Sequence, residues 1–228
     1  MAIPDQLVRQ IVDEVKVVTR QLVEDYRRRI LVNEDQLTGA LVSMLEYRLR
    51  DLSVEGIQVI PRALSLKEEK ITGADLGVLL NIDTPYFKLS KVLIAQAKKC
   101  ECFYIGKNFG YVLGRNYLGN VIEQCQKMLD ITSSAFVLVY TNNFDCGILA
   151  FPAGDVIALS KVMCTDLSAL YAIRLDRLFE NFVKCYTGDP RIAKAYWDFG
   201  GLTEFMAEHK IRHGLLLMLR SREGWRPE

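Results

Sequence analysis

The sequence lacks long apolar runs, a secretory leader and any abundance of cysteine. Its longest apolar stretches, such as 135–140 and 215–219, are far shorter than the roughly 20 residues that cross a bilayer. The N-terminus has neither a basic start nor a small-residue cleavage site, and six cysteines in 228 residues are too few for a disulfide scaffold. We therefore expect no membrane segment, and a cytoplasmic protein with reduced thiols.

The sequence also lacks an excess of either charge. Lysine and arginine number 29 against 28 aspartates and glutamates, which leaves a formal net charge of +1. No general polyelectrolyte attraction therefore marks a nucleic-acid or membrane binder, and an anionic substrate must be held by local charge. Half of the residues are hydrophobic and a quarter are charged, which indicates a folded chain. The length favours one elaborated domain, 1–228, over two.

Apolar spacing predicts helices near both ends of the chain and strands between them. An apolar stripe predicts an N-terminal helix over 5–30, and a leucine repeat after Asn33, a suitable N-cap, predicts a second helix that ends near Asp51. Pro61 marks a bulge or an edge position in the first strand. Strands are expected at 57–66, 74–82, 91–99, 135–140 and 147–151, a helix at about 116–129, and mostly helix over 166–222. This order predicts an α/β or α+β fold.

Two neighbouring strands carry polar residues where they are expected to meet. Alternation places Gln96 and Lys98 on one face at the end of their strand, while Asp75 begins the preceding strand. An antiparallel hairpin around a turn at 83–90 would pair Asp75 with Lys98, at the end that also holds Gln96. A carboxylate, an amide oxygen, the Ala97 carbonyl and a lysine suit Mg²⁺ binding and phosphodiester hydrolysis. The alternative is a simple cross-strand ion pair at a sheet edge.

These residues resemble the PD-(D/E)xK superfamily, the restriction-endonuclease-like nucleases. Asp75, twenty residues and then Gln96, Ala97 and Lys98 match its D…QxK variants, within TGADLGVLLNI and VLIAQAKK. NEDQLTGALVSML resembles the first core helix, and IEQCQKMLDITSSAFVLVY resembles the helix and strand that follow the motif. The resemblance covers 33–152 and implies an α/β core of helix, three-strand antiparallel meander, helix and strand. The segments 5–30 and 166–222 would add helices outside this core.

The resemblance implies a Mg²⁺-dependent DNA endonuclease, with Mn²⁺ as a possible substitute. Glu34, Asp75, Gln96 and the Ala97 carbonyl would hold the metal, while Asp75, Gln96 and Lys98 would be catalytic, with Lys98 positioning the attacking water. Gln96 replaces the usual Glu, which removes one negative charge and implies a weaker or differently tuned metal site. Analogy of fold alone suggests prokaryotic defence against foreign DNA. The alternative is a nuclease-fold binding or assembly module that has lost turnover.

The basic residues near the motif could contact DNA. Lys99, Lys107 and Arg115 are interleaved with aromatic residues, and Gln124 would border the site. The other interpretation, which is left open, is that the aromatic side chains cover the sheet while the cations are only solvated.

Metal and nucleophile chemistry elsewhere has less support. Cys100 and Cys102 could join His209 and His213, an expected i,i+4 helical pair, in a zinc site; the alternative is ordinary thiols and surface histidines. Serine and cysteine nucleophile schemes are set aside, because there are only two histidines and neither has a recognisable partner.

Cleavage of both strands of a duplex needs two active sites, so we expect a symmetric homodimer. The apolar stripe that runs from Leu7 to Leu22, or the apolar run at 215–219, would form its interface; the alternative is that both pack on their own sheet. An activating ligand or a regulatory partner is left open. Because Asp75 is expected at a strand end, Asp75→Ala should change the free energy of unfolding by no more than about 1 kcal/mol.

Overall fold

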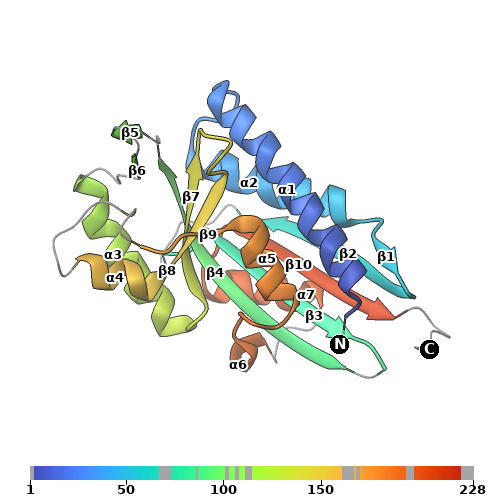
Figure 1. Ribbon diagram of the computed structural model, residues 1–228. Coiled ribbons are helices and arrows are strands. Elements are labelled where there is room, and N and C mark those ends of the chain that lie inside the picture. The colour runs from blue at the N-terminus through green and yellow to red at the C-terminus, as the bar shows by residue number, and fades with distance from the viewer. Residues whose placement is uncertain are drawn as a thin grey trace.

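A mixed eight-stranded sheet forms the centre of the molecule, in the order β1-β2-β10-β3-β4-β7-β8-β9 (Figure 1). The computed structural model describes residues 3–66, 73–85, 87–100, 103–105, 108–110, 115–160, 167, 170–193 and 198–221. The strands are β1 (Ser53–Val54), β2 (Ile57–Ser65), β3 (Leu76–Asp83), β4 (Lys88–Cys100), β5 (Phe103–Ile105), β6 (Asn108–Gly110), β7 (Ala135–Thr141), β8 (Ile148–Pro152), β9 (Ile173–Arg174) and β10 (His213–Ser221). The helices are α1 (Asp5–Arg27), α2 (Glu34–Leu49), α3 (Arg115–Ile131), α4 (Ala153–Ser160), α5 (Leu175–Val183), α6 (Pro190–Ala193) and α7 (Phe199–Glu208). The predicted α/β class is confirmed.

Helices pack on both faces of the sheet and form two apolar cores. Alternation along β4 sends Leu93 and Ala95 into one core and Val92 and Ile94 into the other. The first core contains apolar residues of α1, α2 and α5, and α1 lies beside both of the other helices (Figure 1). The second core contains residues of α3, α4 and α7. The result is a helix, sheet, helix arrangement.

The two N-terminal helices form where their sequence patterns predict them. The stripe from Leu7 to Leu22 is buried along α1, and the Asn33 Oδ1 accepts a hydrogen bond of 2.8 Å from the Gln36 backbone N–H as the N-cap of α2. Pro61 also lies as predicted, on an edge. β1 pairs with β2 only at Ile57 and Gln58, so within the described residues the outer side of β2 at Pro61 faces no strand.

The β3–β4 hairpin exists, but its register differs from the prediction by two residues. Leu76 pairs with Ala95, which places Asp75 opposite Gln96 rather than Lys98. The reason is the turn: β4 already begins at Lys88, so the connection is shorter at its far end than the predicted turn at 83–90. The error preserves the face of each side chain, because the strand period is two.

The predicted three-strand antiparallel meander is wrong, since β10 lies between β2 and β3. It runs antiparallel to β2 and parallel to β3. The prediction of helix over the last part of 166–222 is also wrong, because residues 213–221 form this strand. A strand buried on both faces reads as an unbroken apolar run, which periodicity cannot distinguish from a buried helix. Gly214 lets α7 pack closely on this strand, because a Cβ at this position would lie 2.1 Å from the Met206 Sδ and the Met206 side chain would have to move.

Both surfaces predicted for a homodimer are buried within the chain. Leu7, Ile11, Val15, Val18 and Leu22 pack in the first core, and the run at 215–219 lies inside the sheet. The alternative interpretation, that both segments pack on their own sheet, holds for the N-terminal stripe, whereas the run at 215–219 is itself part of a strand of the sheet. Among the helices that the structure describes, none has the length and apolar character to span a membrane.

Candidate active site

Five strand ends meet at one end of the sheet. β3 and β10 begin there, and because β2 and β4 run antiparallel to them, those two strands end there. β7 is parallel to β4 and also ends there. The first turn of α2 reaches this end, since the Glu34 and Asp35 side chains bond to residues of β4 and β10. The topology therefore brings together polar residues that lie far apart in the sequence.

Asp75 is the centre of this polar cluster and is almost completely buried. Its Oδ2 accepts hydrogen bonds from the Gln96 Nε2 and from the Ala97 backbone N–H, the latter at 2.9 Å. Its backbone is held on both sides, by the Ala95 carbonyl at 2.8 Å and the His213 N–H at 3.0 Å. Truncation of Asp75 to Ala would remove the acceptor of two buried donors, so we expect a larger loss of stability than its position at a strand end alone predicts.

Glu34 joins the same strand edge from α2. Its Oε1 accepts a hydrogen bond of 3.2 Å from the Lys99 N–H, two residues beyond the Ala97 N–H that Asp75 occupies. N–H groups two residues apart on a strand are separated by roughly 7 Å. The two carboxylates thus border the part of β4 that extends past the beginning of β3.

The Tyr140 hydroxyl is affected by the charges of both carboxylates. Its ring is fully buried, and its hydroxyl donates to the Thr38 Oγ1 at 3.1 Å. Burial raises the pKa of the Tyr140 hydroxyl far above its usual range, and the negative charges of Asp75 and Glu34 add to that rise. Nothing in the sequence distinguishes Tyr140 as a site residue except its place at the end of an apolar strand.

Lys98 is buried on the β4 face that also carries Gln96, toward α3. Burial raises the pKa of the Cys125 thiol in α3 to about 12, and the positive charge of Lys98 opposes this rise. Gln124 lies beside the chain that leads to Asp75. A Cβ on Gly73, whose φ is +80°, would lie 2.8 Å from the Gln124 Cα. The structure therefore places Lys98 and Gln124 on the α3 side of the cluster.

Two carboxylates and two amide oxygens are the groups in this cluster that could bind a hard cation. Within the described ranges, no three His, Cys, Asp or Glu side chains are grouped closely enough to hold a metal ion. A cation would therefore depend on the two carboxylates and on neutral oxygens. Two such oxygens, Gln96 Oε1 and Gln124 Oε1, are buried and have no hydrogen-bond partner among the described residues. Carboxylate and amide oxygens with added water suit Mg²⁺.

The predicted DNA contacts are placed only in part. Lys99 is exposed, and its Nζ donates to the Val32 carbonyl at 3.0 Å. Lys107 lies outside the described residues, and so does the side chain of Arg115 at the beginning of α3.

The predicted zinc arrangement is wrong in its geometry. His209 caps the end of α7 while His213 begins β10, so the two histidines are not an i,i+4 helical pair. Cys102 lies outside the described residues, and Cys100 is buried on β4.

His213 also has partners that the sequence does not indicate. Its Nδ1 lies 2.9 Å from the Ser65 Oγ, and its Nε2 lies 2.9 Å from the Asp35 Oδ1. The statement that neither histidine has a recognisable partner is therefore wrong. The sequence does not indicate these contacts because they require β10 to lie beside β2, whereas the sequence predicts a helix in place of β10.

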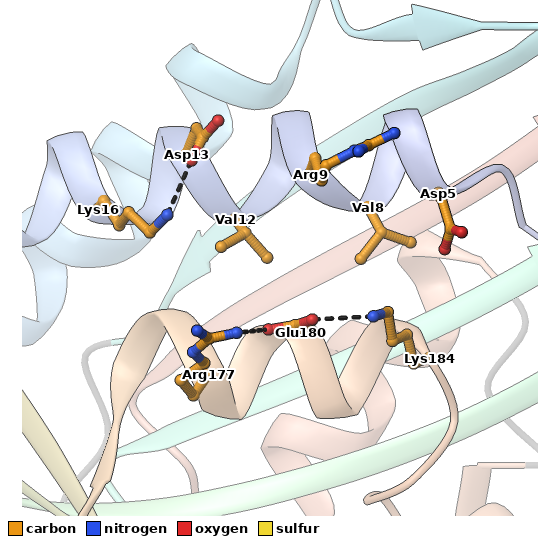
Figure 2. A pocket seen from close by; sticks show the side chains of 9 residues that line it. All are labelled: Asp5, Val8, Arg9, Val12, Asp13, Lys16, Arg177, Glu180 and Lys184. Carbon is orange, nitrogen blue, oxygen red and sulfur yellow. Dashed lines mark hydrogen bonds and ion pairs between the residues drawn. The ribbon is translucent and has the colours of Figure 1, made fainter.

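A charged groove between α1 and α5 contains none of the predicted site residues (Figure 2). Glu180 lies between Arg177 and Lys184 and bonds to both, while Asp13 pairs with Lys16 across 2.9 Å. Because most of these charges are paired with one another, the groove gives no reason to expect a strongly charged ligand.

Comparison of the chain with protein-family models, with curated proteins and with solved structures finds no match.

Proposed function

We propose that this chain is a metal-dependent endonuclease that hydrolyses phosphodiester bonds in DNA. The observation that carries the proposal is the gathering of Asp75, Gln96 and Lys98 with Glu34 at one end of the sheet. The order α2, β2, β3, β4, α3, β7 supports a core like that of the restriction-endonuclease-like nucleases. The position of β10 departs from that pattern, because it separates β2 from β3.

Glu34, Asp75, Gln96 and the Ala97 carbonyl would hold Mg²⁺, or Mn²⁺ in its place. The ion would supply Lewis-acid stabilisation of negative charge on the scissile phosphate. The Gln96 Nε2 donates to Asp75 and to the Ala97 carbonyl, so its amide group would have to turn over before Oε1 could bind a cation. Asp75 is the more deeply buried of the two carboxylates, and we expect it to contribute more to metal affinity than Glu34.

Lys98 would orient the attacking water and stabilise the charge that develops on the phosphate oxygens. Its burial makes the ammonium charge more effective there than it would be in bulk solvent. Lys99, Lys107 and Arg115 would bind the DNA backbone, and Gln124 would border the reacting phosphate. We propose foreign DNA in prokaryotic defence as the substrate, a step that rests on resemblance alone.

One observation favours the second candidate, a nuclease-fold binding or assembly module without turnover. Gln96 stands where related nucleases carry Glu, and its amide already satisfies the buried Asp75 carboxylate. An amide donor that satisfies this carboxylate without a cation is what a site that has lost its metal would contain.

Metal-dependent cleavage of plasmid DNA separates the two candidates. The purified chain is incubated with supercoiled plasmid in Mg²⁺, in Mn²⁺ and in EDTA. We expect nicked or linear products in either metal and none in EDTA. DNA binding without cleavage, in either ion, would support the module and contradict the nuclease.

A further inference from the structure

A second array of hydrogen-bonded side chains lies beside the proposed nuclease site and contains none of the residues of that site. Ser65, His213 and Asp35 form a continuous line of hydrogen bonds, with 2.9 Å from the Ser65 Oγ to the His213 Nδ1 and 2.9 Å from the His213 Nε2 to the Asp35 Oδ1. A hydroxyl, an imidazole and a carboxylate hydrogen-bonded in this order are the groups of a catalytic triad, in which the imidazole acts as the general base that activates the hydroxyl as a nucleophile.

The partners of His213 determine which ring nitrogen carries the proton. Burial disfavours ionisation of Asp35, but hydrogen bonds from Arg212 and His213 outweigh it and lower the pKa of Asp35. An ionised carboxylate only accepts, so the neutral ring donates its Nε2–H to Asp35. The Nδ1 of the neutral ring is then an acceptor, and the Ser65 hydroxyl donates to it. This is the tautomer that a general base for Ser65 requires.

The surrounding structure holds the array in place. Ser65 and His213 are paired Cα positions of β2 and β10, so the sheet sets their separation. Arg212 bonds to the Asp35 Oδ1 at 2.7 Å and fixes the carboxylate. A Cβ on Gly39 of α2 would lie 3.2 Å from the His213 Cε1, so the glycine leaves room for the ring against the helix. His213 is buried while Ser65 is exposed, which shields the base and presents the hydroxyl to solvent.

We propose that Ser65 is an activated serine that accepts acyl groups from carboxylic esters. The Ser65 Oγ would attack the ester carbonyl carbon as its proton passes to the His213 Nδ1. The bond to the leaving alcohol then breaks, and that alcohol departs with the proton from Nδ1. Water, activated by the same nitrogen, hydrolyses the acyl-serine and restores the enzyme. Asp35 stabilises the imidazolium that forms between these steps.

The test uses p-nitrophenyl acetate and a fluorophosphonate probe on the full chain in EDTA, which removes any metal-dependent reaction. Ser43, exposed on α2 and outside the array, provides the matched control. We expect release of p-nitrophenolate, fluorophosphonate label on the peptide that contains Ser65, and loss of both in Ser65→Ala but not in Ser43→Ala. His213→Gln should slow labelling by about 100-fold, the size of a general-base contribution.

Asp35→Asn keeps the test decisive if His213→Gln fails to fold. Asp35 is exposed, so its amide variant should fold, and we expect labelling at least about 10-fold slower because the ring loses its anionic partner. Label spread over several serines, or Ser65 labelled equally fast in the Asp35→Asn chain, would overturn the proposal. Because the assay contains no metal and no DNA, its failure would leave the nuclease proposal untouched.

Discussion

Lys91 provides a sharp test of the fold, because the structure buries its charge. The Lys91 side chain on β4 is only 2% exposed; its Nζ donates to the Thr187 carbonyl at 2.7 Å and lies 4.8 Å from the centre of the Phe182 ring. Burial lowers the pKa of Lys91 from 10.5 to about 8, although its interaction with Cys185 opposes that shift. The native state therefore releases this proton at a lower pH than the unfolded chain does.

The direction of the pH effect follows from this difference. Between about pH 8 and 10.5 the unfolded chain binds more protons at Lys91 than the native protein, so the free energy of unfolding rises with pH. Below about pH 8 both states are protonated, and the unfavourable contribution of the buried charge is complete. A pKa difference of about 2.5 corresponds to about 3 kcal/mol in total, of which about 2 kcal/mol should appear between about pH 7.5 and about pH 9.5.

Urea unfolding of the wild type and of Lys91→Met across this range measures the effect. The difference between the two proteins contains the titration of Lys91 and its coupling to Cys185, since Cys125 and Tyr140 titrate alike in both. We expect the stability of the wild type to rise relative to Lys91→Met by about 2 kcal/mol between the two pH values. A difference that stays constant with pH would refute the burial of a charged Lys91.

Three further predictions concern the site and the strand beside it. Asp75→Ala should lower the free energy of unfolding in urea by about 2–4 kcal/mol, because the buried Gln96 amide and Ala97 N–H lose their acceptor; a loss below about 1 kcal/mol would contradict this hydrogen-bond network. Gln96→Glu should raise the Mn²⁺-induced shift in melting temperature, since an anionic oxygen replaces a neutral one; an unchanged shift would place position 96 outside the metal shell. Gly214→Ala should cost about 1 kcal/mol in the same urea assay, because the buried Met206 side chain would have to move to make room for the Cβ, and a stabilised variant would contradict the close packing of Met206 on β10.

Local signals account for what the sequence predicts correctly. The apolar stripe of α1 and the Asn33 cap of α2 depend on residues close together in the sequence, and both are found where they are predicted. The β3–β4 hairpin also forms. The hairpin register is displaced by two residues because it depends on the length of the turn, which composition does not determine. Since a shift of two conserves the faces, Asp75 and Gln96 still meet.

The errors about the meander, the C-terminal helix and the partners of His213 have one physical origin, the position of β10. Nothing local distinguishes its buried apolar run from a helix, and its pairing with β2 and β3 depends on contacts more than a hundred residues away in the sequence. The array of Ser65, His213 and Asp35 exists only through that pairing, so the sequence offered no spacing by which to find it.

The nuclease proposal is tested most directly by variants at the two ends of one hairpin. Asp75→Asn and Lys98→Met alter the proposed site. Asp83→Asn and Lys88→Met make the same chemical changes in an ion pair of 2.8 Å at the opposite end of β3 and β4. In Mg²⁺ and Mn²⁺ we expect the wild type and the Asp83 and Lys88 variants to cleave plasmid DNA at equal rates, and the Asp75 and Lys98 variants to be at least about 100-fold slower while still folded. Undiminished cleavage by a folded Asp75→Asn chain, or equal losses at both ends, would contradict the proposed site.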